Sequence, residues 1–154
     1  MPKVLFVCTA NRYRSPIAAA CFRKELAIRK PEGDWGVSSA GTWAEEGMPA
    51  AGGAIVFAQG LGMNIMGHRS RMIDARLAGE ANVIIVMEQG HKEALRSEFP
   101  SEGGKVYLLS EVATGESFDV PDPVGPEGGE GVENEIEGMI HAGFERICEL
   151  AGEA

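Results

Sequence analysis

The sequence has 154 residues, of which 44% are hydrophobic and 24% are charged, and its formal net charge is −9. A chain of this length and composition is expected to fold as one globular domain over residues 1–154. The negative charge argues against nucleic acid as a partner. No apolar run approaches the roughly 20 residues that a membrane-spanning helix needs, and the first apolar stretch is too short for a secretory signal, so no membrane insertion is expected.

The cysteines, Cys8, Cys21 and Cys148, are odd in number and lack paired spacings. This pattern argues against a disulfide framework and predicts a reducing, cytoplasmic location. Cysteine and histidine residues nowhere cluster with the spacing of metal ligands, so neither a metal nor another cofactor is expected. Because an acidic surface repels anions, any phosphate site must be local and rich in hydrogen-bond donors.

Short apolar runs and helical periodicity alternate along the chain. Strands are predicted over 3–7, 35–40, 82–87 and 105–109, and helices over 15–30, 50–61 and 90–98. A closing helix carries one apolar stripe, formed by Ile136, Ile140, Gly143, Ile147 and Leu150. The segment 111–131 is rich in Gly, Pro and Asp and is predicted to be an ordered functional loop or a mobile lid.

This alternation predicts an α/β fold with a four-stranded parallel sheet, right-handed crossovers and helices on both faces. Ligands in such folds bind beyond the carboxyl ends of the strands. Cys8 comes directly after the first predicted strand, so it is expected at that edge of the sheet.

The loop after the first strand, Cys8-Thr-Ala-Asn-Arg-Tyr-Arg14-Ser15-Pro16, is predicted to bind phosphate. A strand that runs into a helix N-terminus directs several backbone N–H groups at one point, where they bind phosphate and stabilise a thiolate. Arg14 can hold two phosphate oxygens in its planar fork. The Ser15 hydroxyl is placed either to cap the helix or to contact the sulfur. The residues expected to surround the phosphate are Thr9, Ala10, Asn11, Arg12, Tyr13 and Ser15.

A second motif, Asp119-Val-Pro-Asp122-Pro123, lies inside the long predicted loop. Release of an alkoxide or phenolate from phosphorus requires a proton, which a carboxylic acid above the site can supply. The flanking prolines restrict the backbone around Asp122, so Asp122 is predicted to be this acid. Asp119 is expected to be a solvated charge, as are the nearby Glu111 and Glu116.

With these motifs the chain resembles the low-molecular-weight protein tyrosine phosphatase family, from about Lys3 to Leu150. The segments Ser38–Thr42, His68–Arg71 and Val86–Glu88 also look like family segments. The resemblance implies that Cys8 is the nucleophile, that Arg14 binds phosphate and that Asp122 is the general acid and then the base. It further implies that Asn11, Ser15, Ser39 and His68 form a hydrogen-bond network that holds the loop. The expected substrate is a phosphorylated protein or peptide, and inorganic phosphate is the expected product.

Three positions depart from the pattern that this family often shows. Tyr13 replaces a second cysteine, Arg12 replaces an apolar residue, and Val124 stands where an aromatic residue often follows the Asp-Pro pair. Phosphotyrosine is the expected substrate, and phosphoarginine is the alternative. A thiol-coupled arsenate reductase needs relay cysteines, and the segment 86–100 contains none. A non-catalytic phosphate-binding module would be favoured by loss of Cys8 or Asp122, and both are present.

The remaining chemically active side chains are given structural roles. Cys21 and Cys148 are predicted to be core residues, because free cysteine behaves as a small hydrophobe. His91 and His141 are predicted to lie on the surface. Trp43 follows the Ser-Ala-Gly-Thr segment and either lines the pocket or caps the core.

Overall fold

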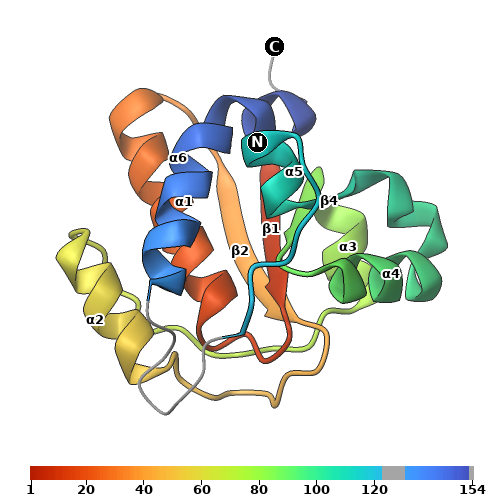
Figure 1. The fold of residues 1–154 in the computed structure, drawn as a ribbon, viewed down its shortest axis with the longest axis horizontal. Coiled ribbons are helices and arrows are strands. Elements are labelled where there is room, and N and C mark those ends of the chain that lie inside the picture. Colours follow the sequence, from red (N-terminus) through yellow and green to blue (C-terminus); the bar gives the residue numbers. More distant parts are fainter. Residues whose placement is uncertain (123–130, 153–154) are drawn as a thin grey trace.

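The computed structural model describes residues 1–122 and 131–152 (Figure 1). The strands are β1 (Lys3–Cys8), β2 (Gly36–Gly41), β3 (Val83–Val86) and β4 (Val106–Leu108). The helices are α1 (Arg14–Arg29), α2 (Gly52–Gly60), α3 (Ala75–Glu80), α4 (Gln89–Glu98), α5 (Leu109–Thr114) and α6 (Val132–Leu150), and a 3₁₀ helix, η1 (Pro100–Lys105), precedes β4.

The strands form one parallel sheet in the order β2-β1-β3-β4, which confirms the predicted fold. β1 is flanked by β2 and β3, and five of its six residues are buried, as a continuous apolar run predicts. The register places Cys8 beside Gly41 of β2. The nucleophile candidate therefore lies at a central position of the sheet, at its carboxyl edge.

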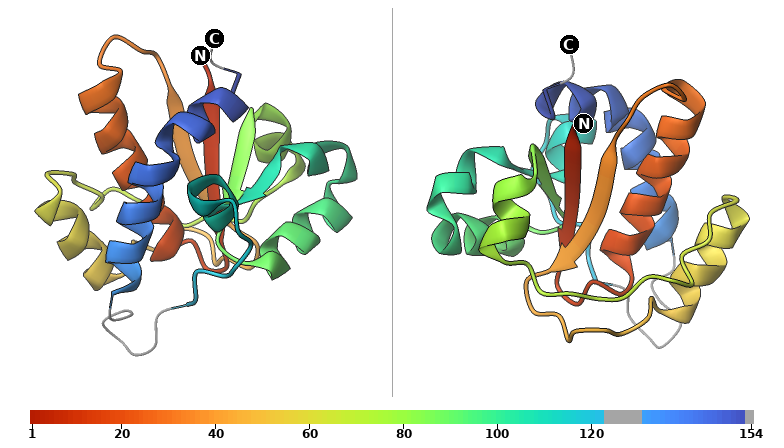
Figure 2. Two further views of the ribbon diagram at one scale, coloured as in Figure 1. Left: turned by 45° about the horizontal axis from the view of Figure 1, so that its top comes forward. Right: turned by 180° about the vertical axis from the view of Figure 1, so that it is seen from behind.

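Helices cover both faces of this sheet, as the views in Figures 1 and 2 show. Alternate residues of β1 point to opposite faces. Val4, Phe6 and Cys8 pack into a core shared with α1, α5 and α6, whereas Leu5 and Val7 pack with residues of α3 and α4. β1 is thus held on both sides, and the loop that follows it starts from a rigid base.

Two short helices, α3 and α5, were not predicted. Each has six residues, too few for a helical period to be distinguished in the sequence. α5 begins at Leu109, so part of the predicted 111–131 loop is helical, and Leu109 and Val112 are buried. α6 packs closely against it, because a Cβ added at Gly143 would lie only 3.0 Å from the Val112 carbonyl oxygen. Residues 123–130 of the predicted loop lie outside the described residues.

The segments that follow β1 and β2 and the segment 119–122 meet at one edge of the sheet, at the bottom of Figure 1. The N–H groups of Thr42 and Trp43 donate to the carbonyls of Cys8 and Thr9, at 2.9 and 3.0 Å. The Val120 N–H donates to the Met87 carbonyl at 2.8 Å. Within the described residues, no helix has the length and apolarity to cross a membrane.

Candidate active site

Cys8 ends β1, and its side chain is buried at the carboxyl edge of the sheet. Its Sγ accepts a hydrogen bond from the Asn11 N–H at 3.3 Å and lies 3.0 Å from the Ser15 hydroxyl oxygen. Both groups can stabilise negative charge on the sulfur. Ser15 thus contacts the sulfur and does not cap α1, whose N-cap residue, Tyr13, makes no capping side-chain hydrogen bond.

Asn11 fixes the shape of the loop. Its φ of 59° is left-handed, a conformation that asparagine tolerates better than most residues. Its Nδ2 donates to the hydroxyls of Ser15 and Ser39, at 2.9 and 3.0 Å. Its carbonyl accepts from His68 Nε2 at 2.7 Å, and its Oδ1 accepts from the Arg71 N–H at 3.0 Å. The structure therefore brings together the four residues expected to form the loop network, and it adds Arg71.

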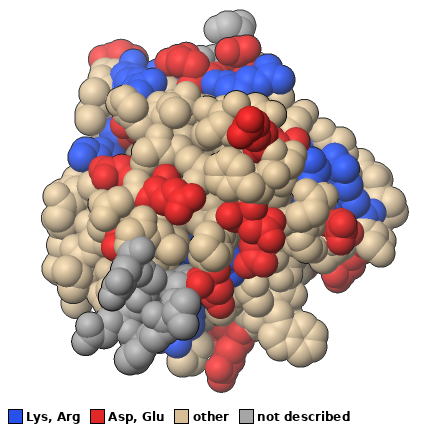
Figure 3. Space-filling model, in the orientation of Figure 1, with Lys and Arg blue, Asp and Glu red and all other residues tan. Residues whose placement is uncertain are grey.

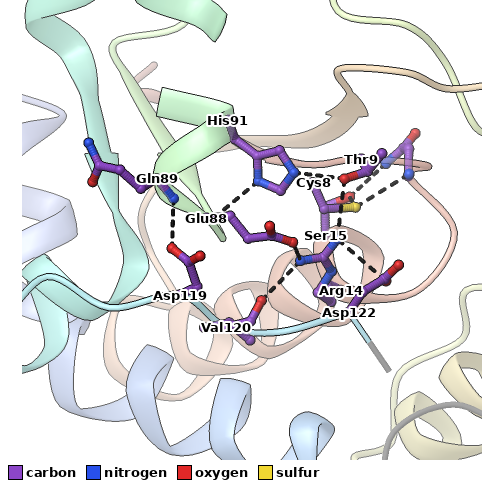
Figure 4. A network of polar contacts seen from close by, with 11 residues as sticks. Cys8, Thr9, Arg14, Ser15, Glu88, Gln89, His91, Asp119, Val120 and Asp122 are labelled. Atoms are coloured by element: carbon purple, nitrogen blue, oxygen red, sulfur yellow. Dashed lines mark hydrogen bonds and ion pairs between the residues drawn. The ribbon is translucent and has the colours of Figure 1, made fainter. Parts of the chain in front are cut away.

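Arg14 is the first residue of α1, and its side chain is only 2% exposed. Its Nη1 donates to the Glu88 carboxylate and, at 2.9 Å, to the Val120 carbonyl. Its Nη2 donates to Thr9 Oγ1 at 3.3 Å and lies 3.4 Å from Asp122 Oδ1 (Figure 4). A charged group this deeply buried is stable because it is paired and hydrogen-bonded. These contacts fix the plane of the guanidinium beside Cys8.

The segment 119–122 is attached to the end of β3 and the start of α4. Asp119 accepts the Gln89 N–H at 2.8 Å, and the buried Val120 bonds to Met87 through its N–H. Asp119 is exposed, as expected of a solvated charge, and it also makes this structural contact. The Asp122 side chain is 74% exposed at the mouth of the site and reaches Arg14. Of the two carboxylates, Asp122 is the one that lies beside the Arg14 guanidinium.

His91 is buried and contacts the loop, so its prediction as a surface residue was wrong. Its Nδ1 accepts the Glu88 N–H at 3.1 Å, and its Nε2 lies 2.8 Å from Thr9 Oγ1. An acceptor at Nδ1 places the proton of the neutral ring on Nε2, which then donates to Thr9. Burial lowers the pKa of His91, and the positive charge of Arg14 lowers it further.

The side chains of Arg12 and Tyr13 bond to residues other than Cys8, and the methyl side chain of Ala10 cannot form a hydrogen bond. Arg12 Nε donates to the Pro49 carbonyl at 2.9 Å, and the Tyr13 hydroxyl donates to Glu133 at 2.7 Å. Burial and this hydrogen bond raise the pKa of Tyr13. Within the described residues, no protein acceptor takes the backbone N–H groups of Ala10, Arg12 and Tyr13. These donors can therefore bind phosphate oxygens.

A groove of about 500 Å³ runs beside the loop. Its walls are formed by Ala10, Arg12, Trp43, Ala44, Glu45, Met48 and Met72. Trp43 is 78% exposed, so of the two roles considered for it the structure excludes the core cap and places it in this groove.

The sequence pattern indicated no function for Glu88 and placed His91 on the surface, although both residues hold the loop and its arginine. A usable signal exists: both follow a predicted buried strand, so they belong to the same carboxyl edge as Cys8. The Val120 carbonyl could not have been found in this way, because a backbone acceptor leaves no trace in residue type.

Acidic side chains are spread over the face of the molecule shown in Figure 3. The positive charge of Arg14, by contrast, is buried beside Cys8, so at this site an anion is attracted from within the loop. In the part of the chain that the structure describes, no three His, Cys, Asp or Glu residues are grouped so that they could hold a metal ion.

Comparison with protein-family models gives a match over residues 3–151, to the family described as low molecular weight phosphotyrosine protein phosphatase. A probable low molecular weight protein-tyrosine-phosphatase, EpsP, from Ralstonia nicotianae is 35% identical over 122 residues, which cover 78% of this chain and 77% of EpsP. The protein-arginine-phosphatase of Bacillus subtilis is 34% identical over 125 residues, which cover 79% of each chain.

Among solved structures, the arginine phosphatase YwlE is similar over 96% of this chain and 95% of its own, with a TM-score of 0.83 and 28% identity. That structure is of a Cys-to-Ser variant whose active-site serine is phosphorylated.

Proposed function

Because the chain belongs to the low molecular weight phosphotyrosine protein phosphatase family, we propose that it dephosphorylates phosphotyrosine in proteins through a phosphocysteine at Cys8. The observation that carries the assignment of residues is the buried Arg14, held by Glu88, Thr9 and the Val120 carbonyl beside the Cys8 sulfur. The phosphorylated serine in the YwlE variant supports a covalent intermediate in this fold.

In the first step, the Cys8 thiolate attacks phosphorus and the bond to the tyrosyl oxygen breaks. Arg14 and the free N–H groups of the loop neutralise the charge on the three non-bridging oxygens. Asp122 gives its proton to the departing phenolate. In the free protein Asp122 lies 3.4 Å from Arg14 Nη2, and a phosphate dianion bound to Arg14 would compete with this carboxylate for the guanidinium.

In the second step, water attacks the phosphocysteine. The Asp122 carboxylate takes a proton from this water, the sulfur–phosphorus bond breaks, and inorganic phosphate leaves. The Asn11 N–H and the Ser15 hydroxyl, which contact the sulfur, stabilise the thiolate that departs. The same contacts therefore serve the nucleophile in the first step and the leaving group in the second.

Phosphotyrosine is the substrate that the groove favours. Trp43 offers an exposed indole face on which a phenyl ring can stack, a contribution of about 0.5–1.5 kcal/mol beyond area burial. Arg12 lines the same groove and would repel a cationic side chain. Val124, which stands where the family often has an aromatic residue, lies outside the described part of the chain.

Phosphoarginine is the second candidate, and two observations favour it. Relatives at similar identity are protein-arginine-phosphatases, and Glu45 in the groove could pair with a guanidino group. Arsenate reduction is not supported, because Cys21 and Cys148 are buried in the core. The cytoplasmic location stays a prediction.

The test uses p-nitrophenyl phosphate and peptides that contain phosphotyrosine, phosphoarginine or phosphoserine. We expect turnover of p-nitrophenyl phosphate, loss of it in Cys8→Ser, and the highest kcat/KM for phosphotyrosine. Trp43→Ala should lower kcat/KM for phosphotyrosine by about 2- to 13-fold, whereas Glu45→Gln should leave it unchanged. A preference for phosphoarginine that Glu45→Gln abolishes would establish the second candidate instead. No phosphatase activity at all would refute the proposal.

A further inference from the structure

A second cavity, of about 340 Å³, lies at the outer edge of the sheet. Its walls come from α1, from the edge strand β2 and from the segment 64–71. That segment belongs to the chain linking α2 to α3, which runs past the end of β2 and the start of α1 (yellow to green in Figure 2, right). Cys8, Arg14 and Asp122 take no part in the cavity. The volume is in the range of small-molecule sites.

The cavity is cationic in a chain whose net charge is −9. Its lining includes Arg23, Arg69, Arg71 and His68, and the described lining residues contain no carboxylate. Across residues 1–122 and 131–152, no ion pair involves any of these three arginines. Arg14, at the first site, is by contrast balanced by Glu88 and Asp122.

Hydrogen bonds to backbone carbonyls use only some of the N–H donors of these arginines. Arg23 Nη2 donates to the Val37 carbonyl at 2.6 Å, and Arg71 Nε donates to the Ser39 carbonyl at 3.1 Å, both on the open edge of β2. Arg69 Nη1 donates to two carbonyls of its own loop. A guanidinium carries five N–H donors. The other guanidinium nitrogens of the three have no acceptor among the described residues.

The positive charges of the three arginines all act on the same side chain, the imidazole of His68. Burial lowers the pKa of His68, its hydrogen bond to the Asn11 carbonyl opposes this, and Arg23, Arg71 and Arg69 lower it further. Three like charges that all reach one imidazole repel one another, and a bound anion would relieve that repulsion.

We propose that this cavity, here called the edge site, binds a small phosphate-bearing anion through Arg23, Arg69 and Arg71. One guanidinium group can bind two phosphate oxygens through two of its N–H donors. The N–H donors of these arginines that have no protein acceptor are available for such contacts. Pro16, Ala19 and Ile65 provide apolar wall for an organic group attached to the phosphate. The proposal does not depend on the reaction at Cys8.

Two lining residues of the edge site contact the phosphate-binding loop. His68 Nε2 and the Arg71 N–H both bind Asn11, whose own N–H contacts the Cys8 sulfur. An anion in the edge site, whose lining includes His68 and Arg71, therefore acts on two of the contacts that fix Asn11. We expect the NMR signals of the Asn11 side-chain amide and the Arg71 N–H to shift when the edge site fills.

The experiment must separate the two phosphate sites. Cys8→Asp places a carboxylate among the loop donors, so it excludes phosphate there by like charge and prevents turnover. This variant is titrated with inorganic phosphate and, separately, with glycerol phosphate, by calorimetry and NMR. One binding event is expected. Equal affinities would identify phosphate alone as the ligand, and tighter glycerol phosphate binding would identify a monoester, both in support of the edge site.

Added to Cys8→Asp, the pair Arg23→Gln/Arg69→Gln should weaken this binding at least about tenfold, because each substitution removes charged hydrogen-bond donors to phosphate. If the double variant folds poorly, Arg69→Gln alone can be used, because it changes an exposed loop position; it should also weaken phosphate binding. The matched control is Arg76→Gln/Arg146→Gln, which removes the same charge at exposed positions elsewhere. No binding at about 1 mM, or equal weakening in the control, would overturn the proposal. In the protein with Cys8 intact, Arg23→Gln/Arg69→Gln should remove one of two phosphate-binding events.

Discussion

His91 contacts two groups, one of which requires a ring nitrogen that accepts a hydrogen bond and the other a ring nitrogen that donates one. Nδ1 accepts from the Glu88 N–H, and Nε2 donates to Thr9. Protonation would place a hydrogen on Nδ1 facing the Glu88 N–H and break the first contact. Since Glu88 and Thr9 both bind Arg14, the neutral ring keeps the guanidinium in position.

This contact makes stability depend on pH. Burial and Arg14 lower the pKa of His91 below the value of about 6.5 that it has in the unfolded chain, although Glu88, Asp119 and Asp122 oppose the shift. Between the two pKa values the unfolded chain binds more protons, so the free energy of unfolding falls as pH is lowered below about 6.5. Urea unfolding at several pH values should show a smaller decline in His91→Asn than in the parent.

The exposed His141 provides the control, because His141→Asn removes a histidine without touching the site. His68, whose pKa is also lowered, should account for the decline that remains in His91→Asn. An unchanged pH dependence in His91→Asn would contradict the assigned ring geometry.

Asp122 and Asp119 are distinguished by what they touch. Asp122→Asn should lower kcat by about 10²–10⁴ on phenyl phosphate, because the leaving oxygen loses its proton donor. The loss in the first step should be much smaller for a very acidic leaving group, and phosphocysteine should then accumulate as a burst.

Asp119→Asn is the matched control, since its amide oxygen can still accept the Gln89 N–H. It should be nearly silent in both assays. Leaving-group dependence in Asp119→Asn and not in Asp122→Asn would reverse the two roles.

At the scale of elements, the site depends on how closely β2 approaches the loop after β1. Gly41 pairs with Cys8, and a Cβ added at Gly41 would lie 2.3 Å from the Thr9 carbonyl oxygen. That oxygen belongs to the backbone, which can move only with the loop. A side chain is therefore excluded at the position beside Cys8, the proposed nucleophile.

Gly41→Ala should accordingly lower kcat/KM strongly, by up to about 10²-fold, since a displacement near 1 Å is enough for such a loss. Overpacking should also destabilise the fold by about 1–3 kcal/mol, measurable by urea unfolding. Gly60→Ala in α2 is the control, because nothing lies within 4 Å of its added Cβ. Normal activity in Gly41→Ala would show that the loop is less constrained than its contacts indicate.

At the scale of the whole molecule, the fold gives its three cysteines different chemistry. All three are buried, but Cys21 and Cys148 lie in helices that pack on the sheet, whereas Cys8 ends a strand among donors. Burial, followed by the negative charge of Glu137, raises the pKa of Cys21 to about 12. A thiol with that pKa is inert near neutral pH.

Iodoacetate at pH 7 should therefore modify Cys8 well before Cys21 or Cys148, and phosphate should protect Cys8. Peptide mapping by mass spectrometry after a short exposure gives the order of labelling. Equal labelling of the three, or labelling of Cys8 that phosphate leaves unchanged, would contradict the site.

The sequence by itself determined the parallel α/β order and the loop from Cys8 to Ser15, and it led to the choice of Asp122 as general acid, which stays a prediction. Each is a local signal: a buried strand reads as an unbroken apolar run, and the loop places its groups on consecutive residues. The left-handed Asn11 could be anticipated for the same reason. Helices α3 and α5, with six residues each, gave no such signal.

Only the tertiary structure decided what holds Arg14 and where Trp43 and His91 lie. Arg14 is separated in sequence by 74 residues from Glu88 and by 106 from Val120. Parallel pairing brings the carboxyl ends of β1 and β3 together, so residues that are remote in the chain become neighbours of one guanidinium. Whether a tryptophan or histidine is buried depends on what packs against it, and that is a property of the assembled layers rather than of the residue.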